Sequence, residues 1–406
     1  MNSRRTFLSF AAALPAFAKP AAKSGPFIND FEAKLARKDF RDIALEDLPT
    51  PAMILDIDAF DHNLKKMSDH CKQAGINLRG HVKIHKSPDV SKRQIAQGAI
   101  GVCCATIAEC ELMVNHGIKG VLFTCQPSGR NKIDRVVALS KYEPTFMTAV
   151  DDPIIARQLQ EAAAAAGTKV NVVVDVFAGL VRQGCPPGNF ALQLAQQVDS
   201  SKNLKLAGLM AYSGAASHTK TFEKRKQRSQ EDIAGMIETA EMCKKSGLPV
   251  AIKTGGSTGT YNIDVGSLTE LQAGSYIFMD TLYLRVGGQG DDAVYRDFKP
   301  ALTVLSTVVS KQRDGKASID AGNKAMLKPT DEVKGRPEVK IENQGAEYGL
   351  LVWKDGDRDY KVGDKVQIYP SNLDTSTNAY DRYYVAKNNK IVDVWPIMDR
   401  AGAPQR

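Results

Sequence analysis

The sequence predicts an α/β protein, in which a (β/α)8 TIM-type barrel is followed by an antiparallel β domain. Two patterns predict the barrel. Eight apolar segments alternate with helical patterns between residues 78 and 275. No glycine fingerprint follows the first strand, whereas an open doubly wound sheet would usually have one there. Beyond residue 295, short β-branched runs separated by turn pairs such as Asp314-Gly315 and Asn388-Asn389 predict the second domain. The doubly wound sheet remains the alternative.

The composition is that of a folded chain large enough for two cores. With 406 residues, 43% of them hydrophobic, the chain is not a peptide hormone, a disordered tail or a disulfide-stapled miniprotein. Lys and Arg outnumber Asp and Glu by 54 to 46, but the charges are interspersed, which favours an anionic small ligand over nucleic acid. The cysteines form no CxxC pair and are expected to be buried free thiols: Cys71, Cys103, Cys104, Cys110, Cys125, Cys185 and Cys243.

Residues 1–18 have the pattern of an export signal. Arg4 and Arg5 precede an apolar run that ends in the small-x-small triplet Ala16-Phe17-Ala18, and this run is too short to span a bilayer. The arginine pair followed by x-Phe-Leu resembles the bacterial twin-arginine signal, which exports folded proteins. We therefore expect a periplasmic mature protein without a membrane span. An ordinary amphipathic N-terminal helix is the alternative.

The remaining elements follow in order. The lead-in, residues 19–56, ends in a strand at Ala52–Asp56 that we expect to join the β domain, and a helix at Asp58–Ala74 opens the barrel domain, residues 57–294. The expected barrel strands are Leu78–Lys83, Gly101–Ala105, Val121–Thr124, Thr145–Val150, Val170–Val176, Leu204–Tyr212, Val250–Thr254 and Leu271–Ser275. The expected helices between them are 87–97, 107–116, 131–140, 153–166, 190–198, 222–246 and 259–266. The β domain takes residues 295–406.

The first barrel strand carries an unusual row of basic residues. Alternate residues of a strand share a face, so the four basic side chains of this segment are expected to point into the barrel: Arg79, His81, Lys83 and His85. Four basic groups in that place need an anionic occupant. A strand that ends early and leaves a solvated basic loop is the alternative.

A loop after the seventh strand predicts where an anion binds. Residues 255–260 read Gly-Gly-Ser-Thr-Gly-Thr, which presents backbone N–H groups and hydroxyls at the barrel rim where phosphate commonly sits. A lysine at the barrel mouth together with a phosphate seat predicts pyridoxal 5'-phosphate (PLP), held by Lys83 as a Schiff base. The lysine must be neutral to attack an aldehyde, and we expect the neighbouring cations Arg79, His81 and Lys86 to favour that form.

Several motifs occur in a fixed order from residue 48 to about residue 384: Leu48-Pro49-Thr50-Pro51-Ala52, the run Arg79 to Pro88, Gly179-x-x-Arg182-x-Gly184, Gly208-Leu209-x-Ala211-Tyr212-x-Gly214, Thr254 to Tyr261, Leu271 to Tyr276, Asp320-Ala321-Gly322-x-Lys324-Ala325 and Pro370-Ser371-x-x-Asp374. Together they resemble the D-threonine aldolase and D-serine dehydratase group of the alanine-racemase-like (fold type III) PLP enzymes. The resemblance implies that Lys83 is the PLP lysine, that Arg182 contacts the ring hydroxyl side and that Tyr212 approaches the ring nitrogen. It implies further cofactor contacts at His81, Gly256, Ser257, Thr258, Gly259, Thr260 and Gln272.

The chain departs from this family at the metal site. The family's aldolases and dehydratases bind a divalent metal through a His-x-Asp or His-x-Cys pair, and here Asn372 and Asp374 stand at those positions. All six histidines lie within the first 218 residues, so the β domain has no histidine to offer. An amide oxygen and one carboxylate suit a divalent cation only weakly.

The combined reading is a PLP-dependent lyase that acts on a D-amino acid, expected to be a β-hydroxy one, by retro-aldol cleavage or by elimination. Lys83 is the expected proton carrier at Cα, and Asp374 the expected group at the β-hydroxyl. Two alternatives remain: a racemase, in which a tyrosine from the β domain of a partner subunit acts as second base, or a catalytically silent PLP or amino-acid binding protein. The candidate tyrosines are Tyr369, Tyr380, Tyr383 and Tyr384. The resemblance also implies a homodimer in which the β domain of one subunit closes the barrel mouth of the other.

Overall fold

The computed structural model describes residues 29–326, 332–354 and 359–399, and the expected export signal lies outside these ranges. The chain divides into two units, residues 1–40 and 41–406. In the first unit, the described part contains a helix, α1 (Asn29–Ala36). The second unit holds a closed barrel and a nine-stranded sheet.

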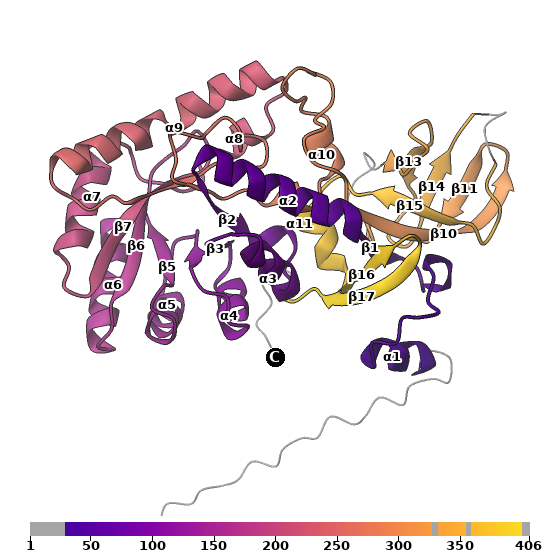
Figure 1. Ribbon diagram of the computed structural model, residues 1–406, viewed down its shortest axis with the longest axis horizontal. Coiled ribbons are helices and arrows are strands. Elements are labelled where there is room, and N and C mark those ends of the chain that lie inside the picture. Colours follow the sequence, from indigo (N-terminus) through magenta and orange to yellow (C-terminus); the bar gives the residue numbers. More distant parts are fainter. Residues whose placement is uncertain (1–28, 327–331, 355–358, 400–406) are drawn as a thin grey trace, which may run out of the picture. The chain divides into compact units, whose positions relative to one another are not determined.

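Eight parallel strands close the barrel in chain order, with helices outside them (Figure 1). The strands are β2 (Asn77–His81), β3 (Gly101–Cys104), β4 (Val121–Phe123), β5 (Met147–Val150), β6 (Val170–Asp175), β7 (Leu204–Ala211), β8 (Ile252–Gly255) and β9 (Glu270–Leu271). The helices are α2 (Ile57–Ala74), α3 (Pro88–Ala96), α4 (Ile107–Asn115), α5 (Arg130–Tyr142), α6 (Pro153–Ala165), α7 (Asn189–Ser200), α8 (Gly214–Ser217), α9 (Phe222–Lys245) and α10 (Thr281–Leu284). The predicted (β/α)8 barrel is confirmed, and the doubly wound alternative is wrong.

Three elements differ from the sequence-based expectation, all near the mouth of the barrel. β2 ends at His81 and continues as a 3₁₀ turn, η2 (Val82–Ile84), because the His81 Nδ1 accepts the Lys83 N–H at 3.4 Å and turns the chain. β9 has only two residues, and a 3₁₀ turn, η3 (Ser275–Ile277), takes the end of the expected eighth strand. The helix expected at 259–266 is a series of turns, joined by short-range backbone bonds such as Ile263 N–H to the Thr260 carbonyl oxygen at 2.9 Å.

The second sheet is built mainly from the C-terminal part of the chain. Its strands are β1 (Ala52–Asp56), β10 (Leu302–Arg313), β11 (Lys316–Ile319), β12 (Glu332–Val333), β13 (Lys340–Asn343), β14 (Gly349–Val352), β15 (Lys365–Tyr369), β16 (Arg382–Lys387) and β17 (Lys390–Pro396). The early strand β1 lies between β10, to which it is antiparallel, and β16, to which it is parallel (Figure 1). A short helix, α11 (Leu373–Ser376), follows β15 and brings the segment after Tyr369 to the barrel.

An ion pair takes part in filling the interior of the barrel. The apolar part of this interior is a small cluster: Cys103, Leu122, Met147, Ala149, Val173 and Met210. Beside it, Arg79 from β2 and Glu270 from β9 are buried and joined by two bonds, Nη2 to Oε1 at 2.7 Å and Nε to Oε2 at 2.9 Å. A Cβ at Gly101 would lie 2.1 Å from the Gly120 carbonyl oxygen and 2.5 Å from the Arg79 Nη1, so the neighbouring strand needs glycine to make room for both the backbone and the guanidinium. Arg79 is therefore a structural residue, and its charge is matched by Glu270 rather than by an occupant of the cavity.

We expect Arg79→Met to lower the free energy of unfolding by about 3–5 kcal/mol, because it leaves the Glu270 carboxylate buried and unpaired. Replacing both residues by methionine should recover most of that loss, since the buried charge is then gone. Denaturant titration of the purified protein measures both effects. The control is Lys65→Met, which breaks an exposed ion pair with Asp69 and should change the free energy by less than about 1 kcal/mol. Equal effects of Arg79→Met and Lys65→Met would contradict the assignment.

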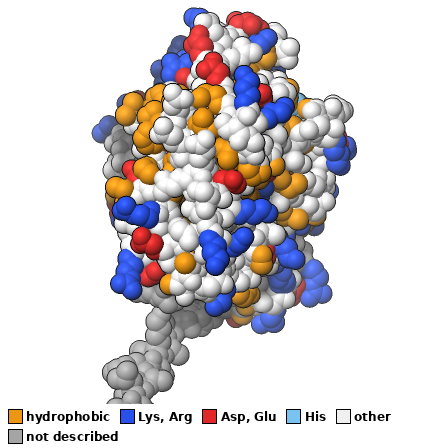
Figure 2. Space-filling model, turned by 90° about the vertical axis from the view of Figure 1, so that its left-hand side faces the viewer, with side chains coloured by type: hydrophobic (Ala, Val, Ile, Leu, Met, Phe, Trp, Pro, Cys, Tyr) orange, Lys and Arg blue, Asp and Glu red, His pale blue; other side chains and the backbone are white. Residues whose placement is uncertain are grey.

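The remaining global features agree with the composition. All seven cysteines are free, and only Cys125 is more than marginally exposed. On the face shown in Figure 2, acidic side chains lie among the scattered lysines and arginines, so the basic excess does not form a continuous stripe there. Among the described residues, no helix combines the length and the hydrophobicity that crossing a bilayer would require.

Candidate active site

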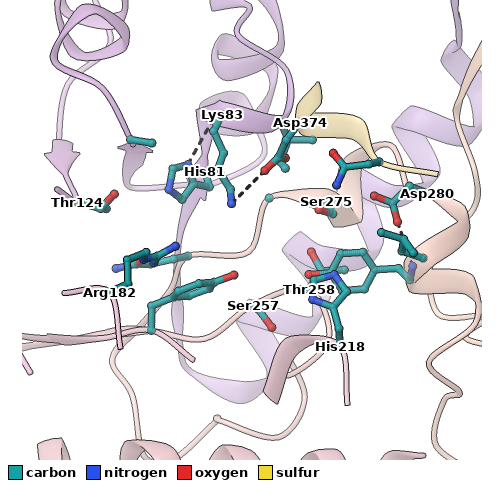
Figure 3. Close-up of a pocket in the computed structure, with 18 of the residues that line it drawn as sticks. His81, Lys83, Thr124, Arg182, His218, Ser257, Thr258, Ser275, Asp280 and Asp374 are labelled. Atoms are coloured by element: carbon teal, nitrogen blue, oxygen red, sulfur yellow. Dashed lines mark hydrogen bonds and ion pairs between the residues drawn. The ribbon is translucent and has the colours of Figure 1, made fainter. Parts of the chain in front are cut away.

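A cavity of about 220 Å³ opens at the carboxyl ends of the barrel strands (Figure 3). Residues from η2, from the loops after several strands and from the segment around α11 line it. Polar side chains lie on two sides: Lys83 and Asp374 on one, and Ser257 and Thr258 across from them (Figure 3). This is the end of a barrel at which binding loops converge.

Lys83 reaches the cavity from the turn after β2 rather than from the strand itself. Its Nζ lies 3.2 Å from the Oδ2 of Asp374, which stands in the first turn of α11. Burial alone would lower the pKa of Lys83, but the nearby Tyr212 and the Asp374 carboxylate outweigh it, and the net shift is upward. The expectation that neighbouring cations keep this lysine neutral is therefore wrong for the chain by itself: Lys83 is an ammonium paired with a carboxylate.

The expected row of four basic side chains is only partly right. Arg79 and His81 do point into the barrel, and His81 lines the cavity. Burial and the adjacent Lys83 lower the pKa of His81, so this imidazole is neutral. His85 is buried away from the cavity, where its Nδ1 accepts the Ser87 N–H at 3.1 Å. The strand's alternation ends at His81, and residues beyond it follow the geometry of the turn.

A second lysine fixes the backbone of both members of the ion pair. Lys86 is buried, and its Nζ donates to the carbonyl oxygens of Lys83 and, at 3.4 Å, of Asp374. These two carbonyls belong to segments almost three hundred residues apart in the sequence. Lys86 therefore connects the barrel turn to α11 at the point where the two reacting side chains meet.

The loop after β8, expected from the sequence to seat a phosphate, places two of its hydroxyl residues at the cavity and uses a third to shape its turn. Ser257 and Thr258 line the cavity. Thr260 lies behind them, and its Oγ1 accepts the Ser257 N–H at 3.0 Å, which shapes the turn. Gly256 has a φ of +71°, a conformation that favours glycine, and a Cβ at Gly259 would lie 2.1 Å from the Ser217 carbonyl oxygen, so the close approach of the backbone requires glycine there. Hydroxyls and a tight glycine turn at the rim fit a phosphate group.

Arg182, Tyr212 and Gln272 also line the cavity. The guanidinium of Arg182 lies 5.8 Å from the centre of the Tyr212 ring, a cation–π contact that holds the two side chains together. Gln272 donates from Nε2 to the Thr254 Oγ1 at 3.1 Å, which fixes its amide at the floor of the cavity. An ammonium, a guanidinium, a neutral imidazole and a hydroxyl seat in one cavity form a set of groups that fits PLP.

Sequence reasoning missed three ionisable residues of the cavity, His218, Asp280 and Tyr283. His218 follows α8 and stacks on Tyr283 with ring centroids 4.5 Å apart, and burial lowers its pKa, so it is a neutral base. Burial raises the pKa of Asp280 to about 7, and its Oδ1 caps α10 by accepting the Tyr283 N–H at 3.0 Å. The signal for His218 was its position four residues after Gly214 in a strand-end motif, whereas nothing in the sequence distinguished Asp280.

Asn372 and Asp374, the weak metal-ligand candidates of the sequence, are both bound by other protein groups. The Oδ1 of Asn372 caps α11 by accepting from the Thr375 N–H at 3.1 Å and the Thr375 hydroxyl at 2.9 Å. Asp374 faces the Lys83 ammonium. Within the described ranges, no group of three or more His, Cys, Asp or Glu side chains is arranged to hold a metal ion. Both candidate ligands are thus engaged by the protein itself.

Two family models cover most of the chain. The alanine racemase N-terminal domain matches residues 55–282, and the putative serine dehydratase domain matches residues 301–386. The boundary between the two matches falls between the last barrel strand and β10.

Individual relatives agree with these matches. The 3-hydroxy-D-aspartate aldolase of Paracoccus denitrificans (strain Pd 1222) is 35% identical over 360 residues, which cover 87% of this chain and 92% of the relative. The D-threonine aldolase of an Arthrobacter species is 31% identical over 355 residues, 86% of this chain and 92% of that one. Among solved structures, D-threonine aldolase from Filomicrobium marinum superimposes with a TM-score of 0.83 at 34% identity, covering 89% of this chain and 98% of that chain.

Proposed function

Because the chain belongs to the alanine racemase-like family of PLP-dependent enzymes, we propose that it is a lyase that cleaves a β-hydroxy D-amino acid into glycine and an aldehyde. The observation that carries this proposal is the Lys83 ammonium 3.2 Å from the Asp374 carboxylate, in a cavity with a phosphate seat on its far side. Aldolases among the similar proteins support cleavage between Cα and Cβ over elimination.

The barrel binds and orients the cofactor. Ser257 and Thr258 offer hydroxyl donors to the phosphate, and the Thr258 Oγ1 is held in place by the Tyr276 N–H at 2.8 Å. Arg182 and Tyr212 stand where they can contact the ring. When bound, PLP supplies an electron sink for the electrons that remain on Cα after the bond breaks.

The protein's side chains move the protons. Asp374 is the proposed acceptor of the β-hydroxyl proton, because its carboxylate faces the cavity beside the lysine that would hold the cofactor. The neutral imidazole of His218 is a second acceptor in the same cavity. Lys83 returns a proton to Cα to complete glycine. Lys86 and the cap at Asn372 hold the backbone at Lys83 and Asp374 and so set the distance between the two reacting groups.

A product assay tests this proposal. The PLP-loaded enzyme is incubated with D-threonine, both 3-hydroxy-D-aspartate diastereomers, D-serine and the L-isomers. Glycine with acetaldehyde or glyoxylate is the expected result. A keto acid with ammonia would instead identify a dehydratase. The proposal would be overturned if no D-substrate gave either lyase product.

The two alternatives have less support. A racemase needs a second base at Cα, which is expected to come from a partner subunit, and within the described part of a single chain none of the four candidate tyrosines lines the cavity. Tyr383 donates its hydroxyl to the His85 carbonyl oxygen and Tyr380 donates to that of Ala325. In the product assay, an L-isomer would favour the racemase, and tight PLP binding without any product would favour a silent binding protein.

We expect lyase activity to be independent of added metal. The Oδ1 of Asn372 caps a helix and Asp374 pairs with Lys83, so neither side chain is free for a cation. Treatment with EDTA followed by Mn²⁺ or Zn²⁺ should leave the rate unchanged. A rate that falls with EDTA and recovers with Mn²⁺ would show instead that a cation displaces these contacts.

The expected homodimer and export are also proposals. Exposed apolar side chains gather on the loop that carries Arg182, where Val181 is 95% exposed, and Leu282 at the cavity is 40% exposed, so a second copy has an apolar surface to cover. Val181→Asp should shift the mass measured by light scattering from dimer to monomer.

Export by the twin-arginine route predicts that replacing Arg4 and Arg5 by lysine retains the protein in the cytoplasm, as cell fractionation would measure.

A further inference from the structure

Arg225, in the first turns of α9, is completely buried and bound only by backbone carbonyl groups. Its Nε donates to the Gly259 carbonyl oxygen at 2.7 Å, and its Nη2 to that of Gly287 at 2.8 Å. Its Nη1 donates to the carbonyl oxygens of Thr219 at 3.0 Å and of Val286 at 3.1 Å. A buried arginine ordinarily pairs with a carboxylate, so this arrangement is unusual.

The positive charge of Arg225 is not neutralised by direct contact. Among the described residues, no carboxylate lies within ion-pair distance of it. Two acidic residues in its surroundings accept other bonds: Asp297 from the Tyr261 hydroxyl at 3.2 Å, and Asp292 from the Phe222 N–H at 3.4 Å. The protein therefore keeps a cation behind the loop after β8 and solvates it with peptide dipoles.

Tyr295 completes the support from the same side. Its buried hydroxyl donates to the Thr258 carbonyl oxygen at 2.7 Å, and its ring lies 5.6 Å from the Arg225 guanidinium. In a trans peptide the C=O and the following N–H point in opposite directions. Because Tyr295 binds the Thr258 carbonyl oxygen, the N–H of Gly259 points away from Tyr295, and the adjacent residues Ser257 and Thr258 line the cavity.

We propose that Arg225 and Tyr295 are positioning residues for the cofactor phosphate: they fix two successive carbonyls of the seat from behind, and Arg225 adds the positive charge that favours a phosphate dianion. The proposal rests on the proposed function in one respect, since it assumes that PLP places its phosphate at Ser257 and Thr258. A buried charge acts on a nearby anion more strongly than an exposed one, because water does not screen it.

A purely structural role for Arg225 predicts a different result. If it only ties α9 to the loops at 219, 259 and 286–287, its loss would weaken the binding of any ligand in the cavity to a similar degree. If it supports the phosphate seat, its loss must weaken PLP binding much more than the binding of pyridoxal, which has the same ring and aldehyde and no phosphate.

The test compares the dissociation constants of PLP and pyridoxal, measured by titration of the cofactor-free protein. The variants are Arg225→Lys and Tyr295→Phe. Tyr261→Phe is the matched control, because it also removes the hydroxyl of a buried tyrosine near this loop. That hydroxyl binds the Asp297 carboxylate rather than the backbone of the loop. We expect Tyr295→Phe to raise the PLP constant about tenfold, as for a lost hydrogen bond at a charged site, with a change of less than about twofold for pyridoxal. Tyr261→Phe should leave the ratio of the two constants as in the wild type.

Inorganic phosphate provides a readout without the ring. Phosphate should compete with PLP in the wild type and compete less well in Tyr295→Phe and Arg225→Lys. The proposal would be overturned if Tyr295→Phe weakened the binding of PLP and of pyridoxal equally, or changed the binding of neither. This holds even if Arg225→Lys does not fold. A wild-type protein that binds pyridoxal as tightly as PLP would instead contradict the placement of the phosphate, and so the proposed function itself.

Discussion

Lys83→Ala is expected to lower kcat for cleavage of the D-substrate by about 10²- to 10⁴-fold or more, the range typical of a lost general acid–base group, with loss of the attachment of PLP adding to it. The same variant should lose the visible absorption of protein-linked PLP, because Lys83 is the amine at the cavity that faces both the phosphate seat and Asp374. Steady-state kinetics and absorption spectra of the PLP-loaded protein measure the two effects.

Chemical rescue separates the chemistry of Lys83 from its ion pair. A small primary amine added to Lys83→Ala should restore part of the rate, since it replaces the missing amino group. The control is Lys387→Ala, which removes an exposed lysine that pairs with Asp58 outside the cavity and should leave kcat unchanged. Full activity in Lys83→Ala would exclude the whole account of the site.

Asp374→Asn is expected to lower kcat about 100-fold or more while leaving the PLP dissociation constant nearly unchanged. The reason is that the amide cannot accept the β-hydroxyl proton, whereas the phosphate seat lies across the cavity and is untouched. KM should change less than kcat, because the proposed role of Asp374 is proton transfer rather than substrate binding. Steady-state kinetics with D-threonine, alongside PLP titration, distinguish these effects.

Asp374 stands in the first turn of α11, so a fault in the helix cap could mimic its loss. Asn372→Ser keeps an oxygen that caps the helix and should retain most of the activity. If Asp374→Asn keeps the wild-type kcat while His218→Gln loses it, the base is the imidazole and the role proposed for Asp374 is wrong.

The barrel was predictable because its pattern is local. Each strand is a short apolar run and each helix shows a 3.6-residue period, so the alternation between residues 78 and 275 is enough to predict a closed parallel barrel. The glycine-rich loop after β8 was predictable for the same reason: the residues that shape it are adjacent in the sequence. Ser257 and Thr260 are joined by a bond across three residues, whereas Thr258 is also held by Tyr276 and Tyr295, which lie farther along the chain.

What the sequence left open depends on contacts between distant segments. Glu270, which lies 191 residues farther along the chain, neutralises the charge of Arg79. The sequence pattern alone therefore overestimated the positive charge that the row of basic residues offers to an anion. Lys83 was expected to be neutral because its cationic neighbours were visible in the sequence, whereas the Asp374 carboxylate arrives from the far end of the chain. His85 left the expected row because a single cap, from His81 to the Lys83 N–H, ends the strand.

The two reacting side chains come from separate halves of the fold: Lys83 from the barrel, and Asp374 from the segment after β15 in the second sheet. With the roles proposed for Lys83 and Asp374, attachment of the cofactor and the choice of which bond to break lie in different stretches of the sequence. Replacing residues 370–376 by a segment with other catalytic side chains is expected to change which bond of the substrate is broken, without altering the barrel. Such a division makes this scaffold a natural starting point for grafting new reactions.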